Sequence, residues 1–243
     1  EAIPLLLTGR DLIGQAGTGT GKTAAFALPL LHRLVSATAA RRGAVRALIL
    51  VPTRELAMQV AEAIHKYAKK TTLTVIPVYG GAPMDHQIRA LRRGADVVIA
   101  TPGRALDHLR RGTLALDALE VLVLDEADEM LDMGFADDLE ALLTATPEGR
   151  QTALFAATMA PRIAAIAEKH LRTPARVFIK AEKRAPGKLP RVRQAAVIVS
   201  RAQKADALGR MLEFEAPTLA IVFCRTRVEV DELTDILKSH SYG

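Results

Sequence analysis

The 243-residue sequence contains no tryptophan, one cysteine, six phenylalanines and three tyrosines. A single cysteine, Cys224, excludes an intrachain disulfide and a zinc site built from several cysteines. Because Cys224 lies in the apolar run IVFC (221–224), we expect it to be a core residue, and the reducing cytoplasm is the compartment that fits. The scarcity of aromatic side chains argues against a surface that stacks many bases of a single strand.

Long hydrophobic runs and a secretory signal are also absent, so we expect no membrane partner. The sequence has no low-complexity tract, which argues against disorder throughout. Lysine and arginine number 33 against 27 acidic residues, giving a net charge of +6. Such a balance is typical of a protein with a polyanionic partner. The alternative is a soluble protein that merely contains more lysine and arginine than acidic residues.

Short apolar runs alternate with segments of helical periodicity, such as 54–70. Several runs are apolar at successive positions, as strands buried on both faces of a parallel sheet must be. The pattern predicts an α/β fold with a doubly wound parallel sheet. The predicted strands are 11–15, 46–51, 73–79, 96–100, 121–125, 152–156 and 175–180.

The alternation is interrupted after residue 180, which suggests two domains. Residues 1–180 form the first, and the charged, Pro- and Gly-rich segment 181–190 is interpreted as a linker, or alternatively as a long surface loop. Residues 191–243 then contain two predicted strands (195–199, 218–223) and two predicted helices (near 202–214 and 226–239). These are too few for a complete domain, so we interpret 191–243 as an incomplete second α/β domain and the chain as an excised or incomplete protein.

Glycine is concentrated in QAGTGTGKT (15–23), between a predicted strand and a predicted helix. In this context glycines let backbone N–H groups converge on phosphate oxygens, and the helix N-terminus adds a partial positive charge. Lys22 can reach the β- and γ-phosphates and Thr23 can place its hydroxyl on Mg²⁺. A glycine turn that binds nothing is the alternative, and Ala16 replaces the glycine of the strict pattern. The predicted nucleotide-binding residues are Ala16, Gly17, Thr18, Gly19, Thr20, Gly21, Lys22 and Thr23.

A second motif, VLVLDEAD, ends at residue 128. An apolar strand that leads into adjacent carboxylates places them at the carboxyl edge of the sheet, where open α/β sheets bind ligands. Asp125 can hold Mg²⁺, and Glu126 can orient or deprotonate an attacking water. We therefore predict Glu126, Lys22 and Asp125 as catalytic residues; an acidic helix N-cap is the alternative.

Together these residues resemble the DEAD-box family of ATP-dependent RNA helicases, whose signature stands at 125–128. Further segments are similar to family motifs in the same order: PTRELA (52–57), GG (80–81), TPGR (101–104), AAT (156–158) and IVFCRTR (221–227). The resemblance implies a P-loop NTPase of recombinase-like type, with ATP and Mg²⁺ as cofactors and ADP as product. It implies RNA contacts at Pro52, Thr53, Arg54, Gly80, Gly81, Thr101, Pro102, Gly103 and Arg104, and coupling of ATP to RNA by Asp128, Ala156, Ala157 and Thr158.

The RNA motifs also have a physical interpretation. PTRELA and TPGR each follow a predicted strand, so their loops should lie at one sheet edge and offer a hydroxyl, backbone N–H groups and an arginine. Such groups bind phosphates without reading bases. A capped helix start with a solvated arginine is the alternative for each, and a plain turn is the alternative for Gly80–Gly81.

The sequence departs from the family at three places. The family's adenine-reading glutamine motif lies upstream of Glu1, and Gly17 stands where the family usually has Gln. Ala156 replaces the serine of Ser-Ala-Thr, which predicts weaker coupling of ATP to unwinding. The arginines of the family's second domain would lie beyond Gly243, so we expect this chain to bind ATP and RNA without full turnover.

The resulting expectation is an ATP-dependent RNA helicase that contacts the RNA backbone irrespective of sequence and locally unwinds short duplexes. An ATP-gated RNA clamp or chaperone stays open as an alternative. A DNA-directed helicase of the same superfamily also stays open, and a P-loop kinase is the least favoured.

Overall fold

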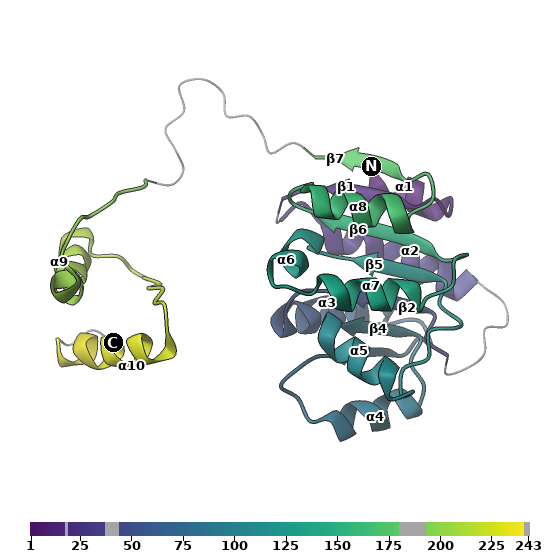
Figure 1. Cartoon of the computed structure of the whole chain (residues 1–243), viewed down its shortest axis with the longest axis horizontal. Coiled ribbons are helices and arrows are strands. Elements are labelled where there is room, and N and C mark those ends of the chain that lie inside the picture. The colour runs from purple at the N-terminus through teal and green to yellow at the C-terminus, as the bar shows by residue number, and fades with distance from the viewer. Residues whose placement is uncertain (18, 37–43, 180–192, 241–243) are drawn as a thin grey trace. The chain divides into compact units, whose positions relative to one another are not determined.

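The computed structural model describes residues 1–17, 19–36, 44–179 and 193–240. The chain divides into two compact units, residues 1–183 and 184–243, and most of their elements are labelled in Figure 1. The predicted linker 181–190 lies outside the described residues. In the part of the chain that is described, no helix is both long and apolar enough to cross a membrane.

The first unit is built on a seven-stranded sheet in which all neighbouring strands are parallel. The strand order is β3-β4-β2-β5-β6-β1-β7. Each strand falls within or overlaps one predicted run, so the α/β prediction is confirmed. The strands are β1 (Leu12–Gln15), β2 (Ala47–Leu50), β3 (Val75–Val78), β4 (Val97–Ala100), β5 (Val121–Leu124), β6 (Gln151–Ala156) and β7 (Ala175–Phe178).

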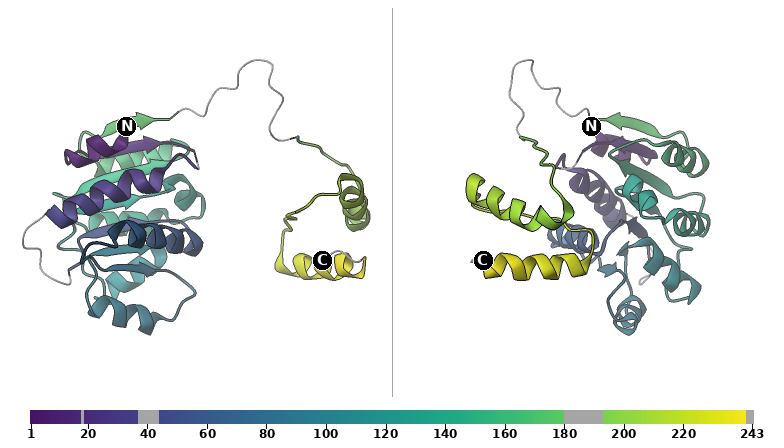
Figure 2. Two further views of the ribbon diagram at one scale, coloured as in Figure 1. Left: turned by 180° about the vertical axis from the view of Figure 1, so that it is seen from behind. Right: turned by 60° about the vertical axis from the view of Figure 1, so that its left-hand side comes forward.

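Helices cover both faces of this sheet, as Figures 1 and 2 show. One face carries α1 (Ala2–Leu7), α2 (Lys22–Ser36) and α3 (Arg54–Ala68). The other carries α4 (Met84–Arg92), α5 (Pro102–Arg110), α6 (Ala127–Asp132), α7 (Ala136–Thr144) and α8 (Pro161–His170).

The buried apolar side chains form two clusters, one under each helix layer. Successive residues of a strand alternate between them: Leu48 and Leu50 of β2 join the α4–α8 layer, whereas Ala47 and Ile49 join the α1–α3 layer. This alternation explains why the strand sequences are apolar at every position. The sheet is therefore doubly wound, and its core lies on both sides.

The second unit contains a short 3₁₀ turn (Arg201–Gln203) and the helices α9 (Lys204–Glu215) and α10 (Arg227–Ser239). Both predicted helices are confirmed. The predicted strands 195–199 and 218–223 are wrong, because neither segment forms a strand within residues 193–240. A strand is stable only when neighbouring strands take up its backbone hydrogen bonds, and the described part of this unit offers neither segment such a partner.

The same lack of a covering layer affects Cys224. Its neighbours Ile221 and Phe223 are 75% and 91% exposed, and Cys224 itself is only partly buried. The prediction of a core cysteine is therefore wrong in the described structure. An apolar run shows that a segment is suited to burial, but not which element will cover it.

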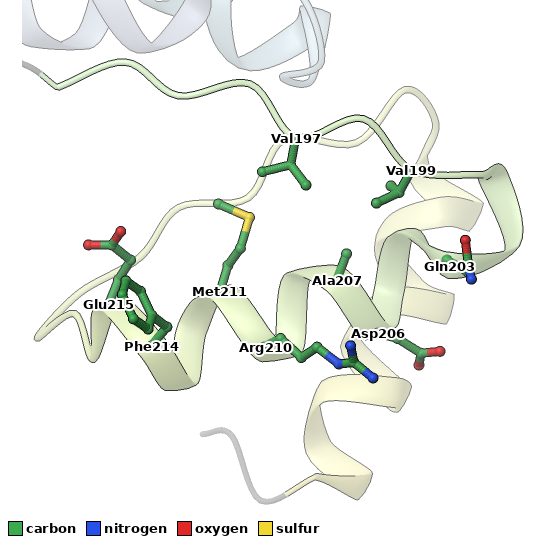
Figure 3. A pocket seen from close by; sticks show the side chains of 9 residues that line it. All are labelled: Val197, Val199, Gln203, Asp206, Ala207, Arg210, Met211, Phe214 and Glu215. Atoms are coloured by element: carbon green, nitrogen blue, oxygen red, sulfur yellow. The ribbon is translucent and has the colours of Figure 1, made fainter.

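An open cavity of about 430 Å³ lies beside α9 in this unit (Figure 3). Val197 and Met211 point toward one another across it, and Phe214 at its end is 85% exposed. Its lining is mixed, because α9 contributes the charged Asp206, Arg210 and Glu215 as well as apolar side chains.

Candidate functional site

The parallel sheet brings the predicted motifs together at its carboxyl edge. The loops after β3, β4 and β2 carry the GG, TPGR and PTRELA motifs, in that order across the sheet. The loops after β5, β6 and β1 follow with the Asp-Glu-Ala-Asp, Ala-Ala-Thr and glycine-rich motifs. Because β2 and β5 are neighbours, the two sets of loops adjoin at the middle of the edge.

The glycine-rich loop leaves β1 and enters α2. Gly19 and Gly21 have φ values of +76° and +82°, a left-handed conformation that residues with a side chain rarely adopt. The N–H of Ala16 donates to the carbonyl of Ala156 at 3.2 Å, which ties the loop to the end of β6. Ala16 is buried and its φ is not positive, so alanine replaces glycine there without strain. Thr18 lies outside the described residues.

Lys22, the first residue of α2, forms an ion pair with Asp125 after β5. Lys22 Nζ and Asp125 Oδ1 are 3.9 Å apart, and their side chains are only 11% and 4% exposed. Burial raises the pKa of Asp125 to about 6, although Lys22 and a hydrogen bond from the Glu126 N–H oppose the rise. Thr23, beside Lys22, is half-buried in the same helix start. A bound cation would stabilise the ionised form of Asp125, and Lys22 would then be available to pair with an anion. The arrangement therefore suits a site that binds a cation and an anion together.

Glu126 links β5 to α6 in a left-handed conformation, with φ 54° and ψ 48°. Such a conformation costs a residue with a side chain on the order of 1–3 kcal/mol and is found preferentially at functional sites. Glu126 is the N-cap residue of α6, and Asp128 and Glu129 lie in the first turn, so the alternative of an acidic helix start holds for the position of these residues. The Glu126 side chain, however, makes no capping hydrogen bond. Its half-buried side chain stands next to Asp125 at the sheet edge.

Asp128 joins the loop after β5 to the loop after β6. Its Oδ2 accepts from the N–H groups of Ala157 and Thr158 at 3.1 and 2.8 Å and from the Thr158 hydroxyl at 3.0 Å. Burial opposes ionisation, but the bonds from Thr158 and Ala157 outweigh it and lower the pKa of Asp128. Gln15 adds a hydrogen bond from its amide to the Ala157 carbonyl at 3.2 Å. The predicted coupling residues are thus hydrogen-bonded to both nucleotide motifs.

The PTRELA segment forms the start of α3. The hydroxyl of Thr53 accepts from the Leu56 N–H at 3.2 Å, so the capping alternative holds for this side chain. Arg54 is exposed, and its guanidinium lies 5.3 Å from the centroid of the Tyr79 ring. Gly81 has φ +79°, and a Cβ there would lie 3.8 Å from Arg54 Nη1. The structure therefore brings Arg54 and the GG turn together.

The TPGR segment forms the start of α5, with Thr101 and Pro102 buried. Arg104 Nη1 donates to the Ala82 carbonyl at 2.9 Å and to Gln87 Oε1 at 3.2 Å. The alternative of a freely solvated Arg104 is therefore wrong. The Pro52 side chain is buried. A Cβ added at Gly80 would meet nothing within 4 Å, and one added at Gly103 would lie 3.4 Å from Asp138 Oδ2.

Sequence reasoning missed two residues of this region, Tyr79 and Gln87. Tyr79 is the last residue of a predicted strand, and nothing in the sequence indicated that its ring would lie beneath Arg54. Gln87 is only 6% exposed although it is polar, and its burial becomes visible only when α4 is packed on the sheet.

The fold and the site together define a nucleotide-binding domain of the P-loop class, with a recombinase-like parallel sheet. A family model described as "DEAD/DEAH box helicase" matches residues 1–166. The chain belongs to the DEAD/DEAH box helicase family.

The chain is similar to RNA helicases of several bacteria. The "DEAD-box ATP-dependent RNA helicase CshA" of Bacillus cereus is 46% identical over 243 residues, covering 100% of this chain and 45% of the relative. The "ATP-dependent RNA helicase DeaD" of Mycobacterium tuberculosis is 48% identical over 242 residues, covering 99% of this chain and 41% of the relative. This chain therefore spans about half the length of the curated relatives that it matches.

A solved structure of a DEAD box protein from Methanococcus jannaschii has a TM-score of 0.69 and 38% sequence identity to this chain. The match covers 99% of this chain and 63% of that one.

Proposed function

We propose that this chain carries the ATP-binding domain of an ATP-dependent RNA helicase, followed by the N-terminal part (191–243) of a second helicase domain. The observation that supports it most is the shared sheet edge. The Lys22–Asp125 pair lies on one half of this edge, and the Arg54 and Arg104 loops lie on the other. The proposed activity is local separation of short RNA duplexes, driven by ATP.

At the nucleotide half, we assign Lys22 to the β- and γ-phosphates and Glu126 to the attacking water. Thr23 and Asp125 would hold Mg²⁺, and their fit rests on the buried carboxylate of Asp125 next to the start of α2. A magnesium ion bound there would neutralise charge on the phosphates. Backbone N–H groups of residues 16–23 would hold the phosphate oxygens, with the glycine conformations already set for this purpose.

At the other half, the loops after β2, β3 and β4 would bind the RNA backbone. Arg54 and Arg104 supply charge, and the helix starts at residues 54 and 102 supply backbone N–H groups. Since these groups suit phosphates, the contacts would be independent of base sequence. The net charge of +6 supports a polyanionic partner. A cytoplasmic location is part of the proposal and rests on the single cysteine.

We further propose that residues 1–243 bind ATP and RNA but do not turn ATP over at the full rate. The chain spans 45% of a curated relative, and arginines of a complete second domain would be needed at the transferring phosphoryl group. Such arginines contribute about 10³–10⁵ in rate.

The test is phosphate release from ATP with and without single-stranded RNA, comparing residues 1–243 with the full-length protein and using Lys22→Ala as the control. We expect RNA-stimulated release only from the full-length protein, and none from its Lys22→Ala variant. RNA-stimulated release by residues 1–243 alone would refute the turnover proposal. A full-length protein that neither binds nor hydrolyses ATP would refute the helicase proposal as a whole.

The second candidate is an ATP-gated RNA clamp or chaperone, and Ala156 favours it because it removes a hydroxyl from the coupling motif. A strand-separation assay on the full-length protein distinguishes the two candidates. ATP-dependent RNA binding without strand separation would support the clamp.

A further inference from the structure

The amide of Gln87 lies at the centre of a buried hydrogen-bond network beneath the proposed RNA-binding loops. Its Nε2 donates to the carbonyl of Tyr79 at 2.9 Å. Its Oε1 accepts from Arg104 Nη1 at 3.2 Å and lies 3.1 Å from His108 Nε2. One side chain of α4 therefore connects the end of β3 to two residues of α5.

The orientation of this amide is determined by its partners. The Tyr79 carbonyl can only accept a hydrogen bond and the Arg104 guanidinium can only donate, so a flipped amide would lose both bonds. Because Oε1 also only accepts, His108 must carry a proton on Nε2. In the neutral ring Nδ1 is then an acceptor for the Thr113 hydroxyl at 2.8 Å, which also lies within hydrogen-bond distance of the His108 carbonyl, at 3.1 Å. Burial, together with the charges of Arg104 and Arg111, lowers the pKa of His108, although Asp107 opposes the shift. The lowered pKa favours the neutral ring.

The network leaves part of Arg104 available. Its Nη1 makes both bonds, to Gln87 and to the Ala82 carbonyl. The Nε and Nη2 groups of Arg104 have no hydrogen-bond partner among the residues that the structure describes. Three N–H donors of a guanidinium held in one place can thus face a phosphate.

Gln87 also reaches the second arginine of the interface. It holds the backbone of Tyr79, and the ring of Tyr79 lies beneath the Arg54 guanidinium. Both arginines assigned to RNA phosphates are therefore placed, directly or through one residue, by the same buried amide. Ordering these side chains before binding lowers the entropy that must be lost when RNA binds.

We propose that Gln87 is a positioning residue for RNA binding, which holds Arg104 directly and Arg54 through Tyr79 in the arrangement that contacts the RNA backbone. The inference rests on the proposed RNA-binding function. It predicts that Gln87 influences how many phosphates the protein contacts although Gln87 itself touches no RNA.

The experiment measures RNA affinity by fluorescence anisotropy with a labelled single-stranded oligonucleotide, a non-hydrolysable ATP analogue and Mg²⁺. The full-length protein is titrated at several salt concentrations, as wild type and as Gln87→Met, Arg104→Gln and the double variant. Each lost phosphate contact on a single strand reduces the slope of log K against log salt by about 0.7. We expect Gln87→Met to weaken RNA binding about tenfold and to reduce the slope by about 0.7, the equivalent of one phosphate contact. Its affinity for the ATP analogue should be unchanged.

The matched control is Gln59→Met, an exposed glutamine of α3 outside the network, which should leave the affinity and the slope unchanged. We expect Gln87→Met to weaken RNA binding less in the Arg104→Gln background than in the wild-type protein. Gln87→Asn keeps the amide but is one methylene shorter, so it should also weaken RNA binding; it replaces Gln87→Met if that variant does not bind the nucleotide.

Three results would count against the inference. A Gln87→Met protein with the wild-type slope and RNA affinity would overturn it and leave the proposed function standing. Lower thermal stability with an unchanged slope would assign Gln87 a structural role only and would equally overturn it. If the wild-type protein binds no RNA, the proposed function itself fails.

Discussion

At the scale of single residues, Asp125 shows a conflict between stability and function. Its carboxyl group is almost fully buried, and burial raises its pKa from 3.8 to about 6. At a pH between these two values, the Asp125 carboxyl group is mostly protonated in the folded protein and mostly ionised in the unfolded chain. The stability contributed by Asp125 is therefore highest at acidic pH and falls as the pH rises toward 6. At neutral pH the protein holds an ionised carboxylate that destabilises it in the absence of a bound cation.

We therefore predict that Asp125→Asn stabilises the ligand-free protein at pH 7.5. The full shift in pKa corresponds to about 3 kcal/mol in the free energy of unfolding, and the gain should shrink as the pH falls from 6 toward 4. Urea denaturation in EDTA measures it, with the exposed Asp132→Asn as the control. An equal stability of Asp125→Asn and wild type across this pH range would contradict the prediction.

Ala156 is a second residue at which a single substitution is informative. Its side chain is fully buried at the end of β6, and its carbonyl accepts from the Ala16 N–H of the glycine-rich loop. Asp128 reaches the same segment through Ala157 and Thr158 only. The hydrogen bonds between Asp128 and the predicted coupling segment therefore involve the two residues after Ala156.

We predict that Ala156→Ser raises the number of base pairs unwound per ATP in the full-length protein, because it restores the family's missing hydroxyl. Parallel measurements of strand separation and phosphate release give this ratio. Ala165→Ser, at an exposed position of α8 outside the predicted motifs, is the matched control and should leave the ratio unchanged. No change in Ala156→Ser would refute the idea.

At the scale of elements, the contact between β1 and β6 positions the glycine-rich loop. Gly14 of β1 pairs with Phe155 of β6, and a Cβ at Gly14 would lie only 2.6 Å from two atoms of the Phe155 ring. That ring also packs on Phe26 of α2, with centroids 5.6 Å apart. The missing side chain of Gly14 thus makes room for the aromatic pair that connects β6 to α2, the helix that begins with Lys22.

We predict that Gly14→Ala destabilises the protein by about 1–3 kcal/mol, because the added methyl group forces the Phe155 ring or β1 to move. Adding Phe155→Leu should recover part of this loss, since the smaller side chain vacates the space. The free energy of unfolding, measured with urea, tests both variants. Gly149→Ala, where the added Cβ would meet nothing within 4 Å, should be nearly neutral, and a Gly14→Ala protein as stable as this control would contradict the packing argument.

At the scale of the whole molecule, the two compact units differ in how completely they bury their apolar side chains. The first has two continuous clusters around its sheet, and every described residue assigned to the nucleotide lies within it. In the second, Ile198, Phe214 and Phe223 are 99%, 85% and 91% exposed. The first unit therefore has the core needed to fold by itself.

We predict that a chain of residues 1–183 binds a fluorescent ATP analogue with Mg²⁺ as tightly as residues 1–243 do. It should also bind less of a hydrophobic dye, because the exposed apolar side chains of the second unit are removed. Equilibrium titration of both chains tests the first expectation. An affinity that falls more than a few-fold on truncation would show that residues 184–243 take part in nucleotide binding.

The sequence by itself determined those features that depend on neighbours along the chain. Apolar runs located the seven strands described in the first unit, and the spacing of glycines before Lys22 predicted the turn between β1 and α2. Both are local patterns, because the strand period and the loop conformation follow from adjacent residues. Where burial depends on a covering layer, as for 195–199, 218–223 and Cys224, the same kind of pattern led to wrong predictions.

Only the tertiary structure decided which motifs are neighbours. The order β3-β4-β2-β5-β6-β1-β7 is not the order of the sequence, and it places the glycine loop beside residues 156–157, more than a hundred positions away. The three bonds to Asp128 and the burial of Gln87 arise in the same way, from elements that pack across the sheet. Hydrogen bonds and ion pairs act over a few ångströms, so their partners are determined only when the sheet order has brought distant segments together.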